Sequence, residues 1–197
     1  MTGIDPVTHL TELAETAARS ATALGAGIRE ATALVHGTLA NGGTLLFCGN
    51  GGSAADAQHM ATEYMVRYRR NRAPLRAIAL TTDTSNLTAC GNDFSFDEIF
   101  SRQVEGLGRA GDLLIVHTTS GNSPNCLQAV EVARAMGMRT LALTAKDGGA
   151  IKGMVDCCLV VPTDRTDRAQ EIHLAIQHAI CDAVESAGLG AGRPATP

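Results

Sequence analysis

Residues 44–59 read TLLFCGNGGSAADAQH, and this stretch decides the fold. An apolar run from Thr44 to Cys48 ends in the small polar residues Gly49 to Ser53, and helical periodicity follows to about Arg69. A short apolar run that ends in a glycine-rich loop is typical of a buried strand. The stretch therefore predicts a strand, a tight loop and a helix, in that order.

Four more apolar runs follow this unit, at residues 75–80, 113–116, 140–143 and 158–161. Helical patterns cover residues 124–136 and 167–187. Strands that alternate with helices form parallel sheets covered on both faces. We therefore predict an α/β fold with one doubly wound, parallel, five-stranded sheet flanked by helices, of the flavodoxin-like kind. Ligands bind such sheets at the carboxyl ends of the strands.

The two ends of the chain differ from this pattern. Residues 5–40 are rich in Ala and Leu, and Gly25 and Gly27 predict a break between two N-terminal helices. Residues 188–197 are small and predict a flexible tail. At 197 residues the chain has the length of one domain, which we place at residues 1–187.

Charge, hydrophobic pattern and cysteine content indicate which partners and which cell compartment to expect. The net charge of -4 and the lack of a basic cluster argue against nucleic acid as a partner. Residues 1–10 lack the charged start and apolar run of a secretory signal, and no apolar run is long enough to cross a membrane. The 6 cysteines form no C-x-x-C motif. We expect a cytoplasmic protein with reduced, mostly buried thiols.

Two loops at predicted strand ends are suited to bind a phosphate. Residues 118–123 read TTSGNS, so hydroxyls and backbone N–H groups can converge at a helix start, although an ordinary helix cap gives the same pattern. Residues 49–54 match the permissive dinucleotide fingerprint G-x-G-x-x-G/A. The acidic residue that this fingerprint requires lies too far along, at Asp83, which argues against a nicotinamide cofactor.

Polar side chains that can bind a metal gather on two predicted helices. His59 and Glu63 lie four residues apart, on one helix face, and His178 and Gln170 lie on the last helix. Such a pair alone is more often a surface hydrogen bond, but the four together are a plausible zinc site of N and O ligands. Gln170 and His178 are about 12 Å apart along a straight helix. Gln170 must therefore sit at a bend, reach along the helix, or serve another subunit.

Other polar residues have less specific patterns. Asp56, three residues before His59, either orients that imidazole or favours the helix N-terminus. His9, His36 and His117 have no neighbours at metal-ligand spacing, so we interpret them as structural.

Five motifs in order resemble the phosphoheptose isomerases of the sugar isomerase (SIS) domain superfamily. They are GNGGSAADAQH at residues 49–59, LTTDTS at 80–85 with LTA at 87–89 and GND at 91–93, FSRQVE at 100–105, TSGNS at 119–123, and QEIH at 170–173 with His178. The match runs from about residue 5 to residue 187. Two departures stand out, since Thr118-Thr119-Ser120 replaces Ser-Thr-Ser and Ala169 replaces a bulkier residue. The added methyl group is expected to alter the sugar pocket.

The resemblance implies a homotetramer with active sites at subunit interfaces, while the lack of a long apolar run predicts no membrane partner. It also implies a zinc ion bound by four residues, His59, Glu63, Gln170 and His178. The implied substrate contacts are Asn50, Gly51, Gly52, Ser53, Glu63, Asn92, Asp93, Thr118, Thr119, Ser120, Ser123 and Gln170. The family reaction converts sedoheptulose 7-phosphate to D-glycero-D-manno-heptose 7-phosphate, a step toward nucleotide-activated heptose.

The expected mechanism moves a carbonyl between two carbons through an enediol. We assign the proton transfers to Glu63 and His178, with zinc as a Lewis acid. The sequence is also compatible with two alternatives. One is a non-catalytic scaffold that binds a replication initiator, as a relative in the superfamily does, and the other is an isomerase of a different ketose phosphate in specialised metabolism. The presence of both Glu63 and His178 favours an enzyme.

Overall fold

The computed structural model describes residues 5–190 and contains one parallel sheet at its centre. Its strands are β1 (Leu45–Gly49), β2 (Ala77–Ala79), β3 (Leu113–His117), β4 (Arg139–Ala145) and β5 (Cys157–Val161). They lie in the order β2-β1-β3-β4-β5, and every neighbouring pair is parallel. This is the flavodoxin-like order. The predicted doubly wound, five-stranded sheet is therefore confirmed.

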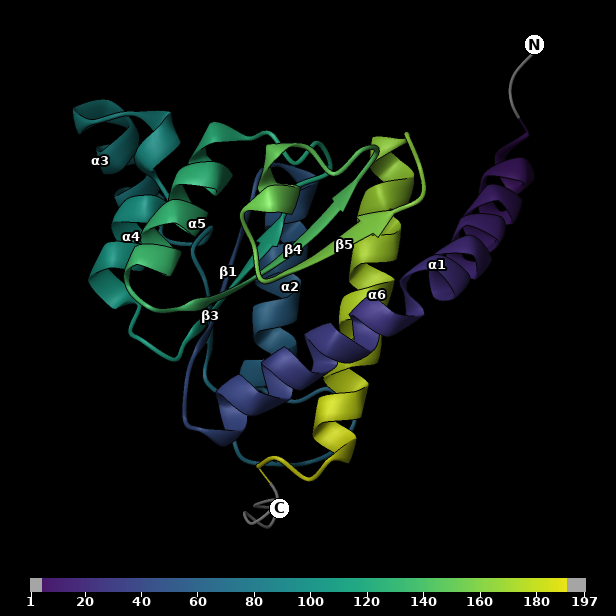
Figure 1. Cartoon of the computed structure of the whole chain (residues 1–197), viewed down its shortest axis with the longest axis horizontal. Helices are drawn as coiled ribbons and strands as arrows, with labels where there is room; N and C mark the ends of the chain where they lie inside the picture. The colour runs from purple at the N-terminus through teal and green to yellow at the C-terminus, as the bar shows by residue number, and fades with distance from the viewer. Residues whose placement is uncertain (1–4, 191–197) are drawn as a thin grey trace.

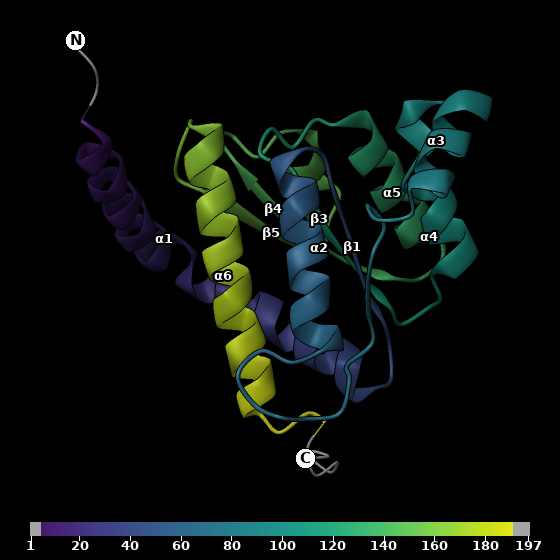
Figure 2. The same cartoon turned by 180° about the vertical axis from the view of Figure 1, so that it is seen from behind.

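Helices cover both faces of the sheet. They are α1 (Pro6–Ala40), α2 (Gly52–Met65), α3 (Thr84–Asp93), α4 (Ser101–Leu107), α5 (Pro124–Ala135) and α6 (Thr166–Ser186), with short 3₁₀ turns at Phe96–Glu98 and Ala150–Gly153. Figures 1 and 2 show α1, α2 and α6 on one face and α4 and α5 on the other, with α3 at the rim. Leu45 and Phe47 of β1 pack into the apolar core beneath α1, α2 and α6. Leu46 and Cys48 pack into the core on the opposite face, beneath α4 and α5. No helix within residues 5–190 has both the length and the apolar character needed to cross a membrane.

The N-terminal segment is one helix, so the predicted break at Gly25 and Gly27 is wrong. α1 continues for 35 residues through both glycines. A glycine inside a helix costs only about 1 kcal/mol relative to alanine, which packing can offset. A Cβ atom at Gly27 would lie 2.8 Å from the Leu159 side chain. Gly27 therefore lets the helix approach β5 closely and does not break it.

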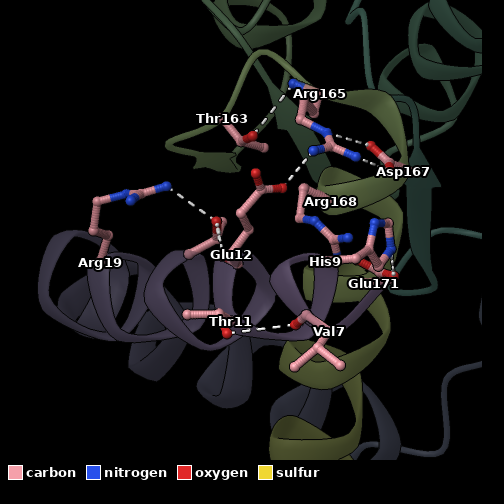
Figure 3. A network of polar contacts seen from close by, with 11 residues as sticks. Val7, His9, Thr11, Glu12, Arg19, Thr163, Arg165, Asp167, Arg168 and Glu171 are labelled. Atoms are coloured by element: carbon pink, nitrogen blue, oxygen red, sulfur yellow. Dashed lines mark hydrogen bonds and ion pairs between the residues drawn. The ribbon is translucent and has the colours of Figure 1, made fainter. Parts of the chain in front are cut away.

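Polar contacts connect the first turns of α1 to the start of α6 (Figure 3). Arg165 pairs with both Glu12 and Asp167, and Glu171 pairs with His9 and with the buried Arg168. Beyond these contacts the first half of α1 is largely exposed and extends past the sheet (Figure 1). Val7 and Leu10 in this half are 64% and 65% exposed, whereas Leu13 packs against the core.

The second helix ends at Met65, four residues before the predicted end near Arg69. The guanidinium of Arg72 donates to the carbonyl of Glu63 at 2.7 Å and to that of Tyr64 at 2.8 Å. These carbonyls belong to the last turn, which in a continued helix would bond to later N–H groups of that helix. The side chain of Arg72, in the following loop, binds these carbonyls instead. Apolar periodicity does not predict such a contact, so the helix end was predicted too late.

Residues 188–190 of the predicted tail lie in turns after α6. The carbonyl of Gly190 accepts a hydrogen bond of 3.1 Å from the N–H of Ala73. The remainder of the predicted flexible tail, residues 191–197, lies outside the described residues.

Candidate active site

A polar cavity of about 260 Å³ lies at the carboxyl ends of β1 and β3. Its lining residues are Asn50, Gly51, Gly52, Ser53, His117, Thr118, Thr119, Ser120, Ser123, Thr166 and Gln170. Three helices begin at this cavity, since Ser53 lies in the first turn of α2, Ser123 occupies the N-cap position of α5 without a side-chain capping bond, and Thr166 is the first residue of α6. Helix N-termini present free N–H groups and a partial positive charge. The cavity is therefore suited to bind an anion.

The hydroxyl groups around this cavity are only partly engaged with the protein. Thr118 Oγ1 lies 3.4 Å from Ser123 Oγ, and Ser120 Oγ accepts from the N–H of Asn122 at 3.2 Å. Among residues 5–190 the hydroxyls of Ser53 and Thr119 make no hydrogen bond to another side chain or to the backbone. They are free to donate to a bound anion.

Two contacts hold the first loop against its neighbours. Asn50 and Asn125 form a reciprocal amide pair, with both hydrogen bonds at 2.9 Å. At Gly52 an added Cβ atom would lie 2.6 Å from the amide of Gln170. A side chain at this position would therefore displace the Gln170 amide where the start of α2 meets α6. The amide pair joins this loop to the first turn of α5, which follows the loop at residues 118–123, and both loops line the same cavity.

A second group of polar side chains lies between α2 and α6, which run side by side (Figure 2). His59, Glu63 and His178 each offer one ligand atom, and these atoms lie within 4.8 Å of one another. The Nε2 atom of His59 is 2.9 Å from that of His178 and 3.3 Å from Glu63 Oε1. Two ligands of one tetrahedral zinc ion lie roughly 3.3 Å apart. The donor set and spacing fit a zinc-like cation with positions left for other ligands.

Electrostatics at this cluster also suit a cation or a proton transfer. Burial lowers the pKa of His178, His59 lowers it further, and Glu63 opposes the shift. A neutral imidazole keeps a lone pair for a metal or a proton. Burial raises the pKa of nearby Asp56 to about 6, although His59 opposes this. Asp56 Oδ2 has no hydrogen-bond partner within residues 5–190, so of the two interpretations of Asp56, the one in which it orients His59 through a hydrogen bond finds no support in this chain.

The structure does not bring every predicted site residue to these two places. Gln170 lines the polar cavity, and along the continuous helix α6 it is about 12 Å from His178. It therefore does not join the other three candidate ligands within one chain. Asn92 and Asp93 lie exposed at the end of α3, where Asp93 lines a separate cavity between α3 and α4.

His117, interpreted above as structural, is part of the cavity. It is fully buried, and Gln177 donates its side-chain N–H to His117 Nε2 at 3.1 Å. The signal available in the sequence was its place at the end of a strand, where ligands bind. Thr166, which also lines the cavity, has no such signal. His9 pairs with Glu171, as a structural interpretation expects.

Acid is expected to destabilise the protein through two buried histidines. Burial lowers the pKa of His117 to about 3, helped by His173, and lowers the pKa of His173 to about 4. Below pH 6.5 the unfolded chain binds these protons while the folded chain does not, so stability falls as pH falls. The slope is at most about 1.4 kcal/mol per pH unit for each histidine. Urea unfolding from pH 7 to pH 5 measures it, and His117→Leu is expected to reduce the slope by about half. An unchanged slope in that variant contradicts the assignment.

Comparisons with known proteins agree with this arrangement. Residues 8–145 match the family model described as the SIS domain. The chain is 53% identical over 178 residues to a phosphoheptose isomerase of Paramagnetospirillum magneticum, covering 90% of this chain and 93% of that one.

Two solved structures named as phosphoheptose isomerases share the fold. The one from Neisseria gonorrhoeae has a TM-score of 0.87 at 46% identity, covering 91% of this chain and 96% of that one. The one from Francisella tularensis has a TM-score of 0.90 at 39% identity, covering 94% and 100%. These matches confirm the resemblance carried by the five motifs, and the chain belongs to the phosphoheptose isomerase family of SIS domain proteins.

Proposed function

We propose that this enzyme interconverts sedoheptulose 7-phosphate and D-glycero-D-manno-heptose 7-phosphate, in the synthesis of nucleotide-activated heptose. The main support is the presence, on one pair of helices, of an anion cavity and an acid–base cluster. The cavity lies at the starts of α2 and α6, and His59, Glu63 and His178 lie farther along the same helices. A sugar phosphate needs both functions.

The polar cavity is proposed to hold the phosphate group. The N-termini of α2, α5 and α6 supply positive potential, and Ser53 and Thr119 supply free hydroxyls. Binding energy from this end of the substrate positions the carbons that react, because they are then held beside the catalytic groups.

Glu63 and His178 are proposed to carry out the proton transfers. The ketose loses a proton from the carbon beside its carbonyl, an enediol forms, and the neighbouring carbon gains a proton. Glu63 is a carboxylate whose side chain is 18% exposed, and the pKa of His178 is lowered by burial. One group accepts the first proton and the other donates the second. Their common cluster favours an enzyme over the scaffold alternative.

Zinc is proposed as the metal, held by His59, Glu63 and His178. When bound it supplies Lewis-acid polarisation of the substrate oxygens. Three protein ligands leave at least one position open, as catalytic zinc sites require. Gln170 is the fourth predicted ligand, and it meets the other three only if another subunit contributes it.

An active site shared between subunits of a homotetramer is consistent with the exposed positions of these groups. His59 is 47% exposed, and Asn92 and Asp93 are exposed on α3, away from the cavity of their own chain. We propose that these residues complete sites with neighbouring copies. We also propose a cytoplasmic location, consistent with Cys48 and Cys126, which are free, buried thiols.

Removing one candidate ligand is expected to abolish stoichiometric zinc binding. His59→Ala takes away an Nε2 atom from the cluster, and the expected result is a loss of at least about tenfold in zinc affinity. Atomic emission on dialysed protein measures zinc per subunit, with His36→Ala as a control. One zinc per subunit retained at wild-type affinity in His59→Ala would remove the metal proposal.

A panel of ketose phosphates tests the substrate. The zinc-loaded enzyme is incubated with sedoheptulose 7-phosphate and with shorter ketose phosphates, and NMR follows the aldose products. We expect the highest kcat/KM with the seven-carbon substrate. Preference for a shorter ketose phosphate would contradict the heptose assignment but keep the isomerase, and no turnover of any substrate would contradict both.

A further inference from the structure

The loop after α2 is fixed by a carboxylate near the end of α6. Glu185, which is 3% exposed, accepts hydrogen bonds from the N–H groups of Tyr68 at 3.2 Å, Arg69 at 2.8 Å and Arg70 at 2.9 Å. Consecutive N–H groups that converge on one anion require a defined backbone conformation. Glu185 therefore fixes the backbone conformation at Tyr68, and with it the place where the Tyr68 side chain begins.

A buried ion pair secures the same loop. Arg72 Nε donates to Glu185 Oε1 at 3.0 Å, and the two side chains are 3% and 2% exposed. Arg72 also binds the carbonyls of the last turn of α2, the turn that contains Glu63. One carboxylate thus connects the end of α6, the loop and the helix that carries His59 and Glu63.

This loop places the ring of Tyr68 on the imidazole of His178. The ring centroids are 5.4 Å apart and the planes are inclined by 22°, which is a stacked arrangement. The ring of His59 approaches His178 edge-on, at 5.0 Å and 70°. The imidazole of His178 therefore contacts the Tyr68 ring through its face and His59 through its Nε2 atom.

A second contact orients the tyrosine ring. The guanidinium of Arg69 lies 5.3 Å from the ring centroid of Tyr68, and the same group donates to Asp182 at 3.0 Å. The Tyr68 hydroxyl makes no hydrogen bond to other residues of the described range 5–190. Tyr68 therefore contacts the site through the face of its ring.

We propose that Tyr68 is a positioning residue for His178. Rotation of an imidazole about its second side-chain torsion is soft, so the imidazole alone does not hold one orientation. A stacked ring on one face restricts this rotation and keeps Nε2 directed at His59 and Glu63. The role rests on the proposed function, because it concerns the geometry of the acid–base and metal cluster.

The test compares Tyr68→Phe, which keeps the ring, with Tyr68→Leu, which removes it. We expect Tyr68→Leu to lower kcat about tenfold with little change in KM, and Tyr68→Phe to resemble wild type. The second readout is the NMR spectrum of the His178 ring protons in the full-length, metal-free protein. Their ring-current shift is expected in wild type and Tyr68→Phe and lost in Tyr68→Leu.

Several outcomes would overturn the proposal. They are wild-type kcat in Tyr68→Leu, an unchanged His178 spectrum in that variant, or an equal loss of kcat in Tyr68→Phe. If Tyr68→Leu does not fold by circular dichroism, Tyr68→Met fills a similar volume without an aromatic ring and takes its place. If wild type does not isomerise any ketose phosphate, the proposed function fails, while the NMR comparison still decides whether the ring of Tyr68 lies on the imidazole of His178.

Discussion

Glu63→Gln is expected to lower kcat by about 10³-fold, a typical effect for the loss of a positioned acid or base. The amide keeps the size of the side chain but cannot accept a proton from the substrate carbon. Glu63 Oε1 lies 3.3 Å from His59 Nε2, so the variant also weakens the candidate metal site. Steady-state kinetics with sedoheptulose 7-phosphate measure the loss, and zinc content measured in parallel separates the two effects.

His178→Ala is expected to cause a loss of similar size, and the double variant is expected to lose little more than either single one, because groups that act as a unit are not additive. Glu131→Gln is the matched control, since Glu131 is exposed on α5, on the other face of the sheet. Turnover near wild type in either Glu63→Gln or His178→Ala would refute the acid–base assignment.

Glu185→Ala is expected to destabilise the fold by about 3–5 kcal/mol, the usual cost of removing one partner of a buried ion pair. The variant leaves Arg72 charged and buried, and it leaves the N–H groups of Tyr68, Arg69 and Arg70 without their acceptor. Urea unfolding followed by circular dichroism gives the change in the free energy of unfolding.

An exposed ion pair on the same helix provides the control for this loss. Asp182 pairs with Arg69 at 3.0 Å, but the side chains are 38% and 66% exposed, so Asp182→Ala is expected to cost less than about 1 kcal/mol. Equal costs for the two variants would show that burial of the Glu185 pair is not what stabilises the loop.

The Glu185 pair also has a defined pH dependence. Burial by itself raises the pKa of Glu185, but the three N–H groups and Arg72 outweigh it and hold the pKa below its ordinary value. The stabilisation is therefore fully present above the ordinary carboxyl pKa. It is lost as the pH falls through the lower, folded value. This loss lies at more acidic pH than the histidine effect described above.

The fold could be predicted from the sequence because each strand carries its own signal. Short apolar runs that end in small polar residues are local features, and all five correspond to strands. The break in α1 was predicted wrongly because the role of Gly27 depends on Leu159, more than a hundred residues away. Propensity alone has no access to such a contact.

The candidate site was predictable where its residues lie within one motif. The loops at residues 49–53 and 118–123 meet in one cavity, and His59 and Glu63 share a helix face. The place of Tyr68 beside His178 was not predicted, because it depends on a loop conformation set by Glu185. The separation of Gln170 and His178 along a helix could also be predicted from the sequence. As this separation indicates, one chain does not bring Gln170 to the other three candidate ligands.

Deuterium incorporation during turnover tests most directly that Glu63 and His178 act on one bound sugar phosphate. The zinc-loaded enzyme is mixed with sedoheptulose 7-phosphate in D₂O, and NMR follows the appearance of an aldose and the label beside its carbonyl. Wild type is expected to form the aldose heptose phosphate with solvent deuterium at that carbon, and Glu63→Gln is expected to form neither. An unchanged ketose with the wild-type enzyme, or full labelling with Glu63→Gln, would contradict the account.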